Sequence, residues 1–342
     1  MKQIKQSLIA VSVFAAILLS PLFHPQVAQA GENLWVYTKG TDTRPKGSTE
    51  LKLGSIGRFG KYSGDYSFYD HRPEIEYGIT DKLTVSGELM IFSHNYSVDN
   101  QENDPMFSTQ AVGEDGGACV SDPENAADCR YNRTQFGGYE LGMKYNVLSP
   151  YKDFMGLSFG LGYEARERYR LDGSNIEQKS FTGTLFMQKD WMDDRLVLAI
   201  NQKMELERRK GQDVLEEEIS LDGSMGISYR FKPKHFLGME IRAQGDFLAP
   251  QTVSTQSNGD GLVNESDWDI FGDGGFKLGN NHQWAAYLGP TYHYAEKDWW
   301  VTTGILFQLA GGSGTDLAFV RDGKNFDEHE SVHIGLTIGY EM

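Results

Sequence analysis

The sequence predicts an all-β fold: a transmembrane antiparallel β-barrel of twelve strands, with fourteen as the alternative count. Three observations predict it: an alternating strand at the end of the sequence, a signal-peptide pattern at its start, and alternation that recurs in between. In residues 332–342, six apolar side chains alternate with small or polar ones. Successive side chains of a strand point to opposite faces, so this stretch has one apolar face. We expect it to close the barrel by pairing with the first strand.

Residues 1–30 have the pattern of a secretory signal peptide. Two lysines precede an apolar run at 8–19, and a small-x-small cleavage site occupies 28–30. The apolar run is too short to span a bilayer as a helix. We therefore expect residues 31–342 to form one mature barrel domain, exported to the outer membrane of a Gram-negative cell.

Composition agrees with a barrel. Hydrophobic residues make up 39 % of the chain and the mean hydropathy is -0.47, which a barrel tolerates because only every second strand residue meets lipid. Aromatic residues reach 12 %, which suits girdles at the membrane interfaces. The net charge of -16 argues against nucleic acid. The expected partners are outer-membrane lipid and lipopolysaccharide, the barrel assembly machinery at the C-terminal strand, and a small-molecule solute.

Alternating segments in the first half of the chain predict six strands. Residues 51–59 place Leu, Phe and small side chains on one face, and 67–79 place Ile and Tyr opposite charged residues. A tight turn at 80–82 leads to the third. The six predicted strands are 51–59, 67–79, 83–91, 139–147, 157–165 and 181–187.

The second half supplies six more strands, with Leu, Ile, Met, Phe, Tyr and Trp at every second position. They are 196–206, 219–231, 237–247, 284–294, 299–309 and 332–342. Residues 267–278 are also strand-like, and fourteen strands would need 34–38 or 317–320 to pair. These strands exceed the five or six residues typical of soluble sheets, which disfavours a soluble β-sandwich.

The lengths of the connections support twelve strands. Bacterial barrels have short periplasmic turns, longer outer loops and an even strand number. With twelve strands, the connections at 80–82, 148–154, 191–194, 232–235 and 296–298 fall on one side, and all are short. The long ones at 98–132, 249–282 and 311–329 fall on the other side. A thirteenth strand at 267–278 would break this parity, so we place that segment in a loop.

Charged residues opposite the apolar rows are expected to line the lumen. The candidates are Arg72, Glu74, Glu76, Glu140, Lys144, Glu164, Arg166, Arg168, Lys203, Glu205, Glu218, Arg230, Glu240 and Arg242. They fit two interpretations: a network that fills the interior, since buried charges must be paired, or the wall of a water-filled path. Eight strands are just filled by side chains and sixteen leave a channel, so twelve leave both interpretations open.

Other motifs predict no catalytic residue, metal site or cofactor. Residues 156–160 match G-x-S-x-G, but that motif needs a strand-to-helix turn, and here it lies inside an alternating strand. His329 and His333 lie four apart, about 13 Å along a strand, which is too far to share one zinc ion. Acidic residues in the loop at 249–282 lack the regular EF-hand spacing, so calcium binding there stays open.

The two cysteines, Cys119 and Cys129, both fall in the longest predicted outer loop. An exported chain passes through an oxidising periplasm, so we predict a disulfide between them. Closing so short a loop would contribute roughly 3 kcal/mol in the chain-entropy model.

The segments 289–294, 299–300, 328–330 and 339–341 resemble the C-terminal part of uncharacterised outer-membrane barrels loosely grouped with the meta-pathway phenol-degradation type. The resemblance implies uptake of small, often aromatic, compounds, and it carries over no site residue. Such proteins usually end in Phe or Trp, whereas this chain ends in Met342.

The expected function is therefore passive, porin-like passage of a small solute through a polar, charge-paired lumen, without enzymatic activity. The first alternative is a non-conducting structural or surface-exposed barrel. The second is an outer-membrane lipid hydrolase, which we disfavour because no Ser or His has a convincing catalytic arrangement.

Overall fold

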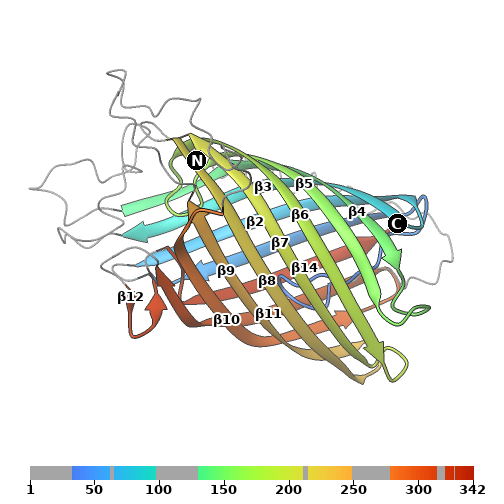
Figure 1. The fold of residues 1–342 in the computed structure, drawn as a ribbon. Coiled ribbons are helices and arrows are strands. Elements are labelled where there is room, and N and C mark those ends of the chain that lie inside the picture. The colour runs from blue at the N-terminus through green and yellow to red at the C-terminus, as the bar shows by residue number, and fades with distance from the viewer. Residues whose placement is uncertain are drawn as a thin grey trace, which may run out of the picture.

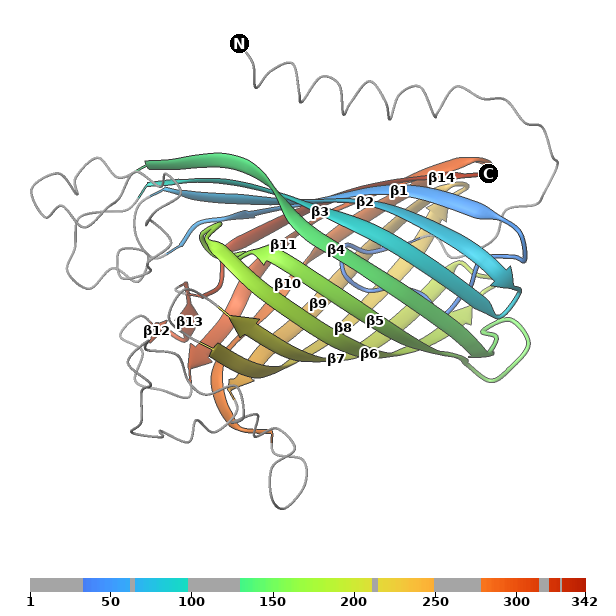
Figure 2. The same ribbon diagram turned by 90° about the horizontal axis from the view of Figure 1, so that it is seen from above.

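A computed structural model describes residues 33–61, 65–97, 130–210, 215–248, 278–313, 320–326 and 328–342. Within these residues, twelve strands form one closed antiparallel barrel (Figures 1 and 2). Their bounds are β1 Thr49–Phe59, β2 Tyr66–Thr80, β3 Leu83–Ser97, β4 Arg130–Leu148, β5 Gly156–Arg168, β6 Asn175–Trp191, β7 Leu196–Lys210, β8 Leu215–Lys232, β9 His235–Leu248, β10 Asn280–Ala295, β11 Trp299–Ser313 and β14 Val332–Glu341. The described part of the chain holds no helix that is long and apolar enough to cross a membrane.

The predicted fold class and strand count are confirmed. Each strand pairs with its neighbours in sequence, and the barrel closes between β1 and β14, where Leu51 pairs with Tyr340. Backbone bonds between Thr49 and Met342 extend this pairing to the end of the chain. Except for β14, which ends at Glu341, the strands are longer than predicted because β-structure continues past the apolar rows: β4 begins at Arg130 rather than at residue 139.

The fourteen-strand alternative does not describe this barrel. Two short strands, β12 (Val320–Arg321) and β13 (Lys324–Asn325), form a separate hairpin instead of joining it. Residues 34–38 pair with no strand, and they lie inside the barrel. The segment 267–277 and the two cysteines lie outside the described residues, so the loop assignment and the disulfide stay predictions.

The barrel has two unlike ends, as the predicted parity requires. The short connections after β2, β4, β6, β8 and β10 gather where the C-terminus lies, which we call the turn end (Figure 2). The opposite end is called the loop end. The turn after β6 reverses the chain with three consecutive left-handed residues, Met192, Asp193 and Asp194, at φ of 58°, 54° and 60°.

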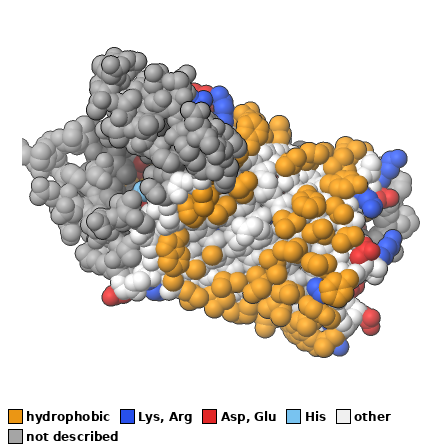
Figure 3. Space-filling model, viewed as in Figure 1, with side chains coloured by type: hydrophobic (Ala, Val, Ile, Leu, Met, Phe, Trp, Pro, Cys, Tyr) orange, Lys and Arg blue, Asp and Glu red, His pale blue; other side chains and the backbone are white. Residues whose placement is uncertain are grey.

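A band of exposed apolar side chains covers the outside of the barrel, seen in orange in Figure 3. Leu161 on β5 and Phe181 on β6 are each 63 % exposed, and Leu141 on β4 is 55 % exposed. Side chains at the alternate positions of the same strands point inward. Such an apolar outer face is the surface that a transmembrane barrel presents to lipid.

The interior is occupied by residues 33–48, which we call the inner segment. This coil, drawn in blue, lies within the ring of strands in both ribbon views (Figures 1 and 2). Trp35 is 1 % exposed, and Thr38 and Thr41 are fully buried. The segment contacts β9, β7, β6 and β3 before it enters β1 at the turn end.

Candidate functional site

The barrel wall is shaped around the inner segment. A Cβ atom added at Gly226 of β8 would collide with the ring of Trp35, and one added at Gly335 of β14 would collide with Val36. Larger residues at these two positions would push the segment off the wall. The glycines therefore admit a chain that packs directly on the strands.

Glu240 of β9 is the main anchor of the inner segment. Its carboxylate is fully buried and accepts the backbone N–H groups of Val36 at 3.0 Å, Tyr37 at 2.9 Å and Thr38 at 2.6 Å. Hydrogen bonds to an ionised carboxylate are shorter and stronger than neutral ones. The buried charge of Glu240 is thus balanced by peptide N–H groups of the inner segment, and these groups have no partner in a strand.

Polar side chains along the wall hold the rest of the segment. Lys39 N donates to Asn201 Oδ1 at 2.6 Å, Thr41 N to Gln188 Oε1 at 2.9 Å, and Arg44 N to Thr84 Oγ1 at 2.7 Å. These acceptors come from β7, β6 and β3 in turn. The inner segment therefore follows the wall around the barrel.

Tyr37 ties the inner segment to the closing strand. Its hydroxyl lies 2.7 Å from Nδ1 of His333 on β14, and the Arg242 guanidinium lies 4.0 Å from its ring centre. His333 also contacts Glu330 at 3.2 Å and stacks on Tyr287.

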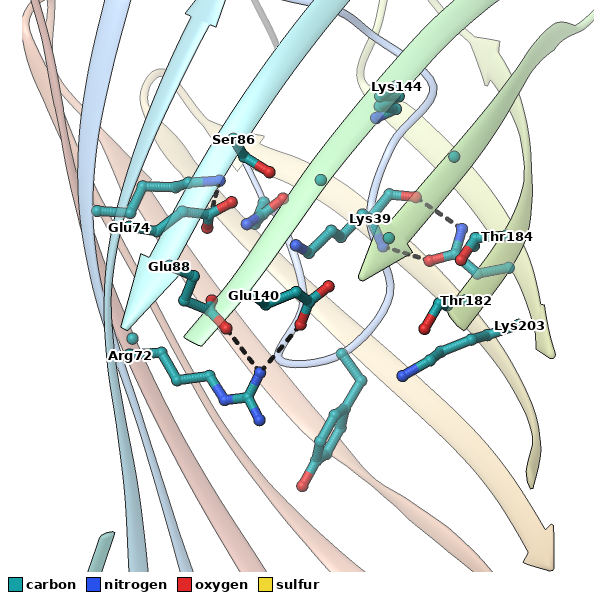
Figure 4. A pocket seen from close by; sticks show the side chains of 18 of the residues that line it. Lys39, Arg72, Glu74, Ser86, Glu88, Glu140, Lys144, Thr182, Thr184 and Lys203 are labelled. Carbon is teal, nitrogen blue, oxygen red and sulfur yellow. Dashed lines mark hydrogen bonds and ion pairs between the residues drawn. The ribbon is translucent and has the colours of Figure 1, made fainter. Parts of the chain in front are cut away.

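Ion pairs fill much of the remaining interior. Arg72 of β2 contacts Asp70 at 2.9 Å, Glu88 at 2.6 Å and Glu140 at 3.5 Å. Figure 4 shows the last two contacts, with Arg72 reaching across to strands β3 and β4. Buried charges are tolerated when paired in this way.

A second set of ion pairs surrounds Glu164 of β5. This 3 % exposed carboxylate lies 2.5 Å from Arg166 and 3.2 Å from Arg170, and Arg166 also reaches Glu207 at 3.1 Å. Further around the wall, Arg242 of β9 contacts Asp222 of β8 at 2.5 Å. The interior is therefore highly charged and largely paired.

The connection between β5 and β6, residues 169–174, folds into the loop end. Leu171 packs on buried aromatic rings of β2, β3 and β4, which are Tyr66, Phe68, Phe92, Tyr96 and Tyr131. Tyr66 donates its hydroxyl to the Leu171 carbonyl at 2.8 Å, and Tyr96 donates to the Asp172 carbonyl at 3.1 Å. Burial raises the pKa of the Asp172 carboxyl to about 6.

Two adjoining cavities remain between these groups. The first has a volume of about 330 Å³ and the second of about 230 Å³. Lys39 and Lys144 point into the first cavity, where hydroxyl groups of Ser86, Thr182 and Thr184 also line the wall (Figure 4). Five side chains line both cavities and so lie between them: Arg58, Arg170, Lys203, Asp222 and Arg242.

The predicted lumen residues fall into four groups. Arg72, Glu74, Glu76, Glu140 and Lys144 line the first cavity, Arg166, Glu205 and Glu218 line the second, Lys203 and Arg242 line both, and Glu164, Arg168, Arg230 and Glu240 line neither. In the last group, Glu164 is buried among arginines and Glu240 holds the inner segment. Arg230 donates to the Asp193 carbonyl in a turn-end connection, and Arg168 is half-buried near the loop end of β5.

Sequence reasoning missed the contribution of the inner segment to the site. Tyr37, Lys39 and Arg44 line the first cavity, although none was a candidate. The alternation of Leu34 and Val36 with Trp35 and Tyr37 indicates an extended chain, but not which surface it covers. Its acceptors Glu240, Asn201 and Gln188 lie about 150 to 200 residues away along the sequence, so no local pattern points to them.

The motifs without an assigned chemistry have structural roles. Ser158, within G-x-S-x-G, lies in the regular strand β5, is fully buried and donates to the Thr41 carbonyl. His329 contacts Gln244, and His333 contacts Tyr37 and Glu330. Among the described residues, no group of three or more His, Cys, Asp or Glu has the arrangement of a metal site.

Comparison with known proteins shows the family and supports the fold. Residues 27–342 match the model described as "Family of unknown function (DUF6662)". An outer membrane channel from Pseudomonas putida F1 is 10 % identical, with a TM-score of 0.51, and the match covers 88 % of this chain and 98 % of that one.

A second solved structure is more distant. The β-domain of the Bordetella autotransporter BrkA is 7 % identical, with a TM-score of 0.47, over 87 % of this chain and 100 % of that one. The likeness to the channel shows a shared barrel fold. No curated protein matches the chain in sequence.

Proposed function

Because the chain belongs to DUF6662, a family whose description assigns no activity, we propose a function from the barrel interior. The protein is an outer-membrane channel that lets a small solute pass passively through a narrow, charged lumen. The observation that carries this proposal is the pair of adjoining cavities, about 330 and 230 Å³, that share five lining residues. Sites for small molecules begin at about 300 Å³, so this interior suits a small solute.

Polar lining supports passage of a water-soluble solute. A water molecule takes about 30 Å³ of liquid volume, so the first cavity has room for roughly ten. Lysine, threonine and serine side chains line it, together with paired carboxylates (Figure 4). Such groups replace part of the hydration shell of a polar solute and fix which solutes enter.

The inner segment explains why the proposed path is narrow. Twelve strands enclose more space than the eight that side chains alone can fill. Here a coil bonded to β9, β7, β6 and β3 takes up part of that space. We therefore expect a small conductance, set by the inner segment as much as by the strands.

The proposal includes a location and partners. The apolar outer band supports insertion among outer-membrane lipid, with the turn end at the periplasm and the loop end, facing lipopolysaccharide, outside. The C-terminal strand β14 would be the element that the assembly machinery recognises. The fold shared with an outer membrane channel is compatible with this role. The sequence resemblance makes aromatic compounds the first solutes to test.

Planar-bilayer recording of the refolded full-length protein tests the proposal. We expect small, ohmic single-channel steps, and swelling of proteoliposomes in small solutes but not in larger oligosaccharides. A heat-denatured sample of the same preparation is the control. Folded barrels that insert but show no current, and no swelling in any small solute, would refute the channel.

The second candidate is a non-conducting structural barrel. Two segments that obstruct the lumen favour it: the inner segment near the turn end and the 169–174 connection at the loop end. The absence of current in that experiment is its expected outcome. A hydrolase is not proposed, because the Ser158 hydroxyl is buried and already bonded to Thr41.

A further inference from the structure

We infer that the boundary between the two cavities is a binding site for a small oxyanion, a solute carrying a carboxylate or a similar anionic group. We call the five residues common to both cavities, Arg58, Arg170, Lys203, Asp222 and Arg242, the junction. This inference deepens the proposed channel function and rests on it, because it names the class of solute. A solute moving from one cavity to the other must pass these side chains.

The junction carries an excess of positive charge. Four of its five side chains are cationic and one, Asp222, is anionic. Arg170 pairs with Glu164 at 3.2 Å and Lys203 with Glu205 at 2.7 Å. Counting those two partners still leaves four cations against three carboxylates. Rings of Arg and Lys side chains are the usual filters of pores that conduct anions.

The guanidinium groups of the junction keep unused hydrogen-bond donors. Arg58 forms no ion pair with any described residue, and its Nε is buried without a partner. Arg242 directs Nε and Nη2 to Asp222 at 2.9 and 2.5 Å, while its Nη1 is buried without a partner. The Nε atom of Arg170 is likewise unpartnered.

A buried donor without a partner costs free energy, and an oxyanion would satisfy these donors. The guanidinium group is planar and presents its N–H groups in a fork that matches a carboxylate. Arg58 comes from β1, Arg170 from the β5–β6 connection and Arg242 from β9, so donors reach the junction from three directions. Tyr37 of the inner segment packs under Arg242 at 4.0 Å and holds that side chain in place.

The lining of the first cavity also favours an anionic solute. Lys39 and Lys144 point into it and form no ion pair with a described residue (Figure 4). Lys144 instead donates to the Gly40 carbonyl and lies 4.6 Å from the Phe186 ring centre. An anion entering from the turn end would meet these ammonium groups before it reaches the junction.

Calorimetric titration of the refolded full chain in detergent micelles tests the inference without relying on conductance. The probes are sodium succinate, a dicarboxylate, and sodium sulfate, a tetrahedral anion, with succinamide and sodium chloride as neutral and ionic-strength controls. The structure predicts saturable binding of at least one oxyanion. Comparison of the two separates a carboxylate site from a site for tetrahedral anions.

Variants locate the binding. Arg58→Gln and Lys203→Gln each remove one junction charge, and Lys203 is 35 % exposed, so its replacement disturbs packing little. Each should weaken binding about tenfold, since each loses a charge-assisted contact. The matched control is Lys234→Gln at the exposed turn end, which lines neither cavity and should stay within about twofold of wild type.

The outcomes separate the two proposals. If neither oxyanion binds, or if the two junction variants bind as tightly as the control, the junction is not an anion site. If the protein binds an oxyanion but passes no current, the channel is refuted and the site stands. If it conducts and shows no binding, this inference fails and the channel stands.

Discussion

Single residues decide whether the inner segment stays bound. Glu240 alone accepts three backbone N–H groups, those of Val36, Tyr37 and Thr38. These peptide groups have no strand partner, and each hydrogen bond to a charged group is worth about 1.5–3 kcal/mol. One side chain on β9 therefore anchors three consecutive peptide groups of the inner segment.

Replacing Glu240 with Gln should loosen the inner segment. The amide keeps one acceptor oxygen, but its NH₂ group faces an N–H donor, so we expect a local loss of about 1–3 kcal/mol. The measurement is limited trypsin digestion of the folded barrel, with mass spectrometry of cleavage after Lys39. Glu296→Gln, at an exposed turn-end site, is the control. Equal resistance of both variants to trypsin would contradict the anchoring role of Glu240.

Asp172 gives the loop end a dependence on pH. Its pKa is raised by burial to about 6, against an ordinary 3.8, so the folded connection favours the protonated carboxyl. The stabilisation is complete below pH 3.8 and is lost as the pH rises through 6. A shift of this size corresponds to about 1–3 kcal/mol.

Hydrogen exchange of residues 169–174, corrected for the intrinsic pH dependence, measures this effect. Protection in the wild type should fall between pH 5 and pH 7.5, and Asp172→Asn should abolish the fall. Exposed Asp153→Asn is a control that should leave it unchanged. A wild-type protection factor that does not vary with pH would overturn the assignment.

The two faces of strand β6 have different surroundings. Phe181 is 63 % exposed on the outer band, whereas the next residue, Thr182, lines the first cavity (Figure 4). Arg at Phe181 should impair assembly by about 2–4 kcal/mol, the cost of a lipid-facing Arg near the midplane. Arg at Thr182 should be tolerated better, since it enters a polar cavity.

The difference is measured on a gel, by comparing the heat-modifiable folded band of the two refolded variants. Because the residues are adjacent, they share depth, strand and local propensity, and differ in the face they occupy. We expect a folded band for Thr182→Arg and a reduced one for Phe181→Arg. Equal folded fractions would show that the outer band does not face lipid.

The strands could be predicted from the sequence because their signal is local. The alternation of apolar and polar side chains is visible within any ten residues. Each hairpin joins strands that are neighbours in sequence, so the order of the strands, their even number and the closure of the barrel follow. The extensions of β3 and β4 toward the loop end could not be predicted in the same way. There the buried aromatic rings, such as Phe92 and Tyr131, face the interior, and the apolar rows no longer mark the outside.

The inner segment could not be predicted because nothing local determines its place. Its acceptors Glu240 and Asn201 are separated from it by more than 160 residues, and the glycines that admit it look like ordinary strand glycines. Alternation gives the face that a residue occupies, but not its neighbours across the barrel. The sequence therefore predicts that Arg242 and Lys203 line the lumen, but not that both line the junction.

For the whole molecule, the inner segment and the barrel act as one closed unit. The strands close through β1 and β14, so the backbone groups at both edges are satisfied, which lipid requires. The inner segment is covalently continuous with β1 but is held by β9, β7, β6 and β3. The inner segment can thus be removed without opening any strand pair. Its removal therefore tests its effect on the lumen separately from the stability of the barrel.

Deleting residues 33–41 should leave a folded barrel with a wider lumen. Trp35, Val36 and Tyr37 would no longer occupy the space beside Gly226 and Gly335, and water would solvate Glu240 and Asn201 in their place. We expect single-channel conductance to rise severalfold, because a twelve-stranded barrel lies between filled eight-stranded ones and open pores. The control replaces the same nine residues with a Gly-Ser stretch of equal length, which keeps the chain but loses the specific packing. Both variants should show the heat-modifiable band of a folded barrel. A folded deletion variant with unchanged conductance would mean that the inner segment does not limit the path.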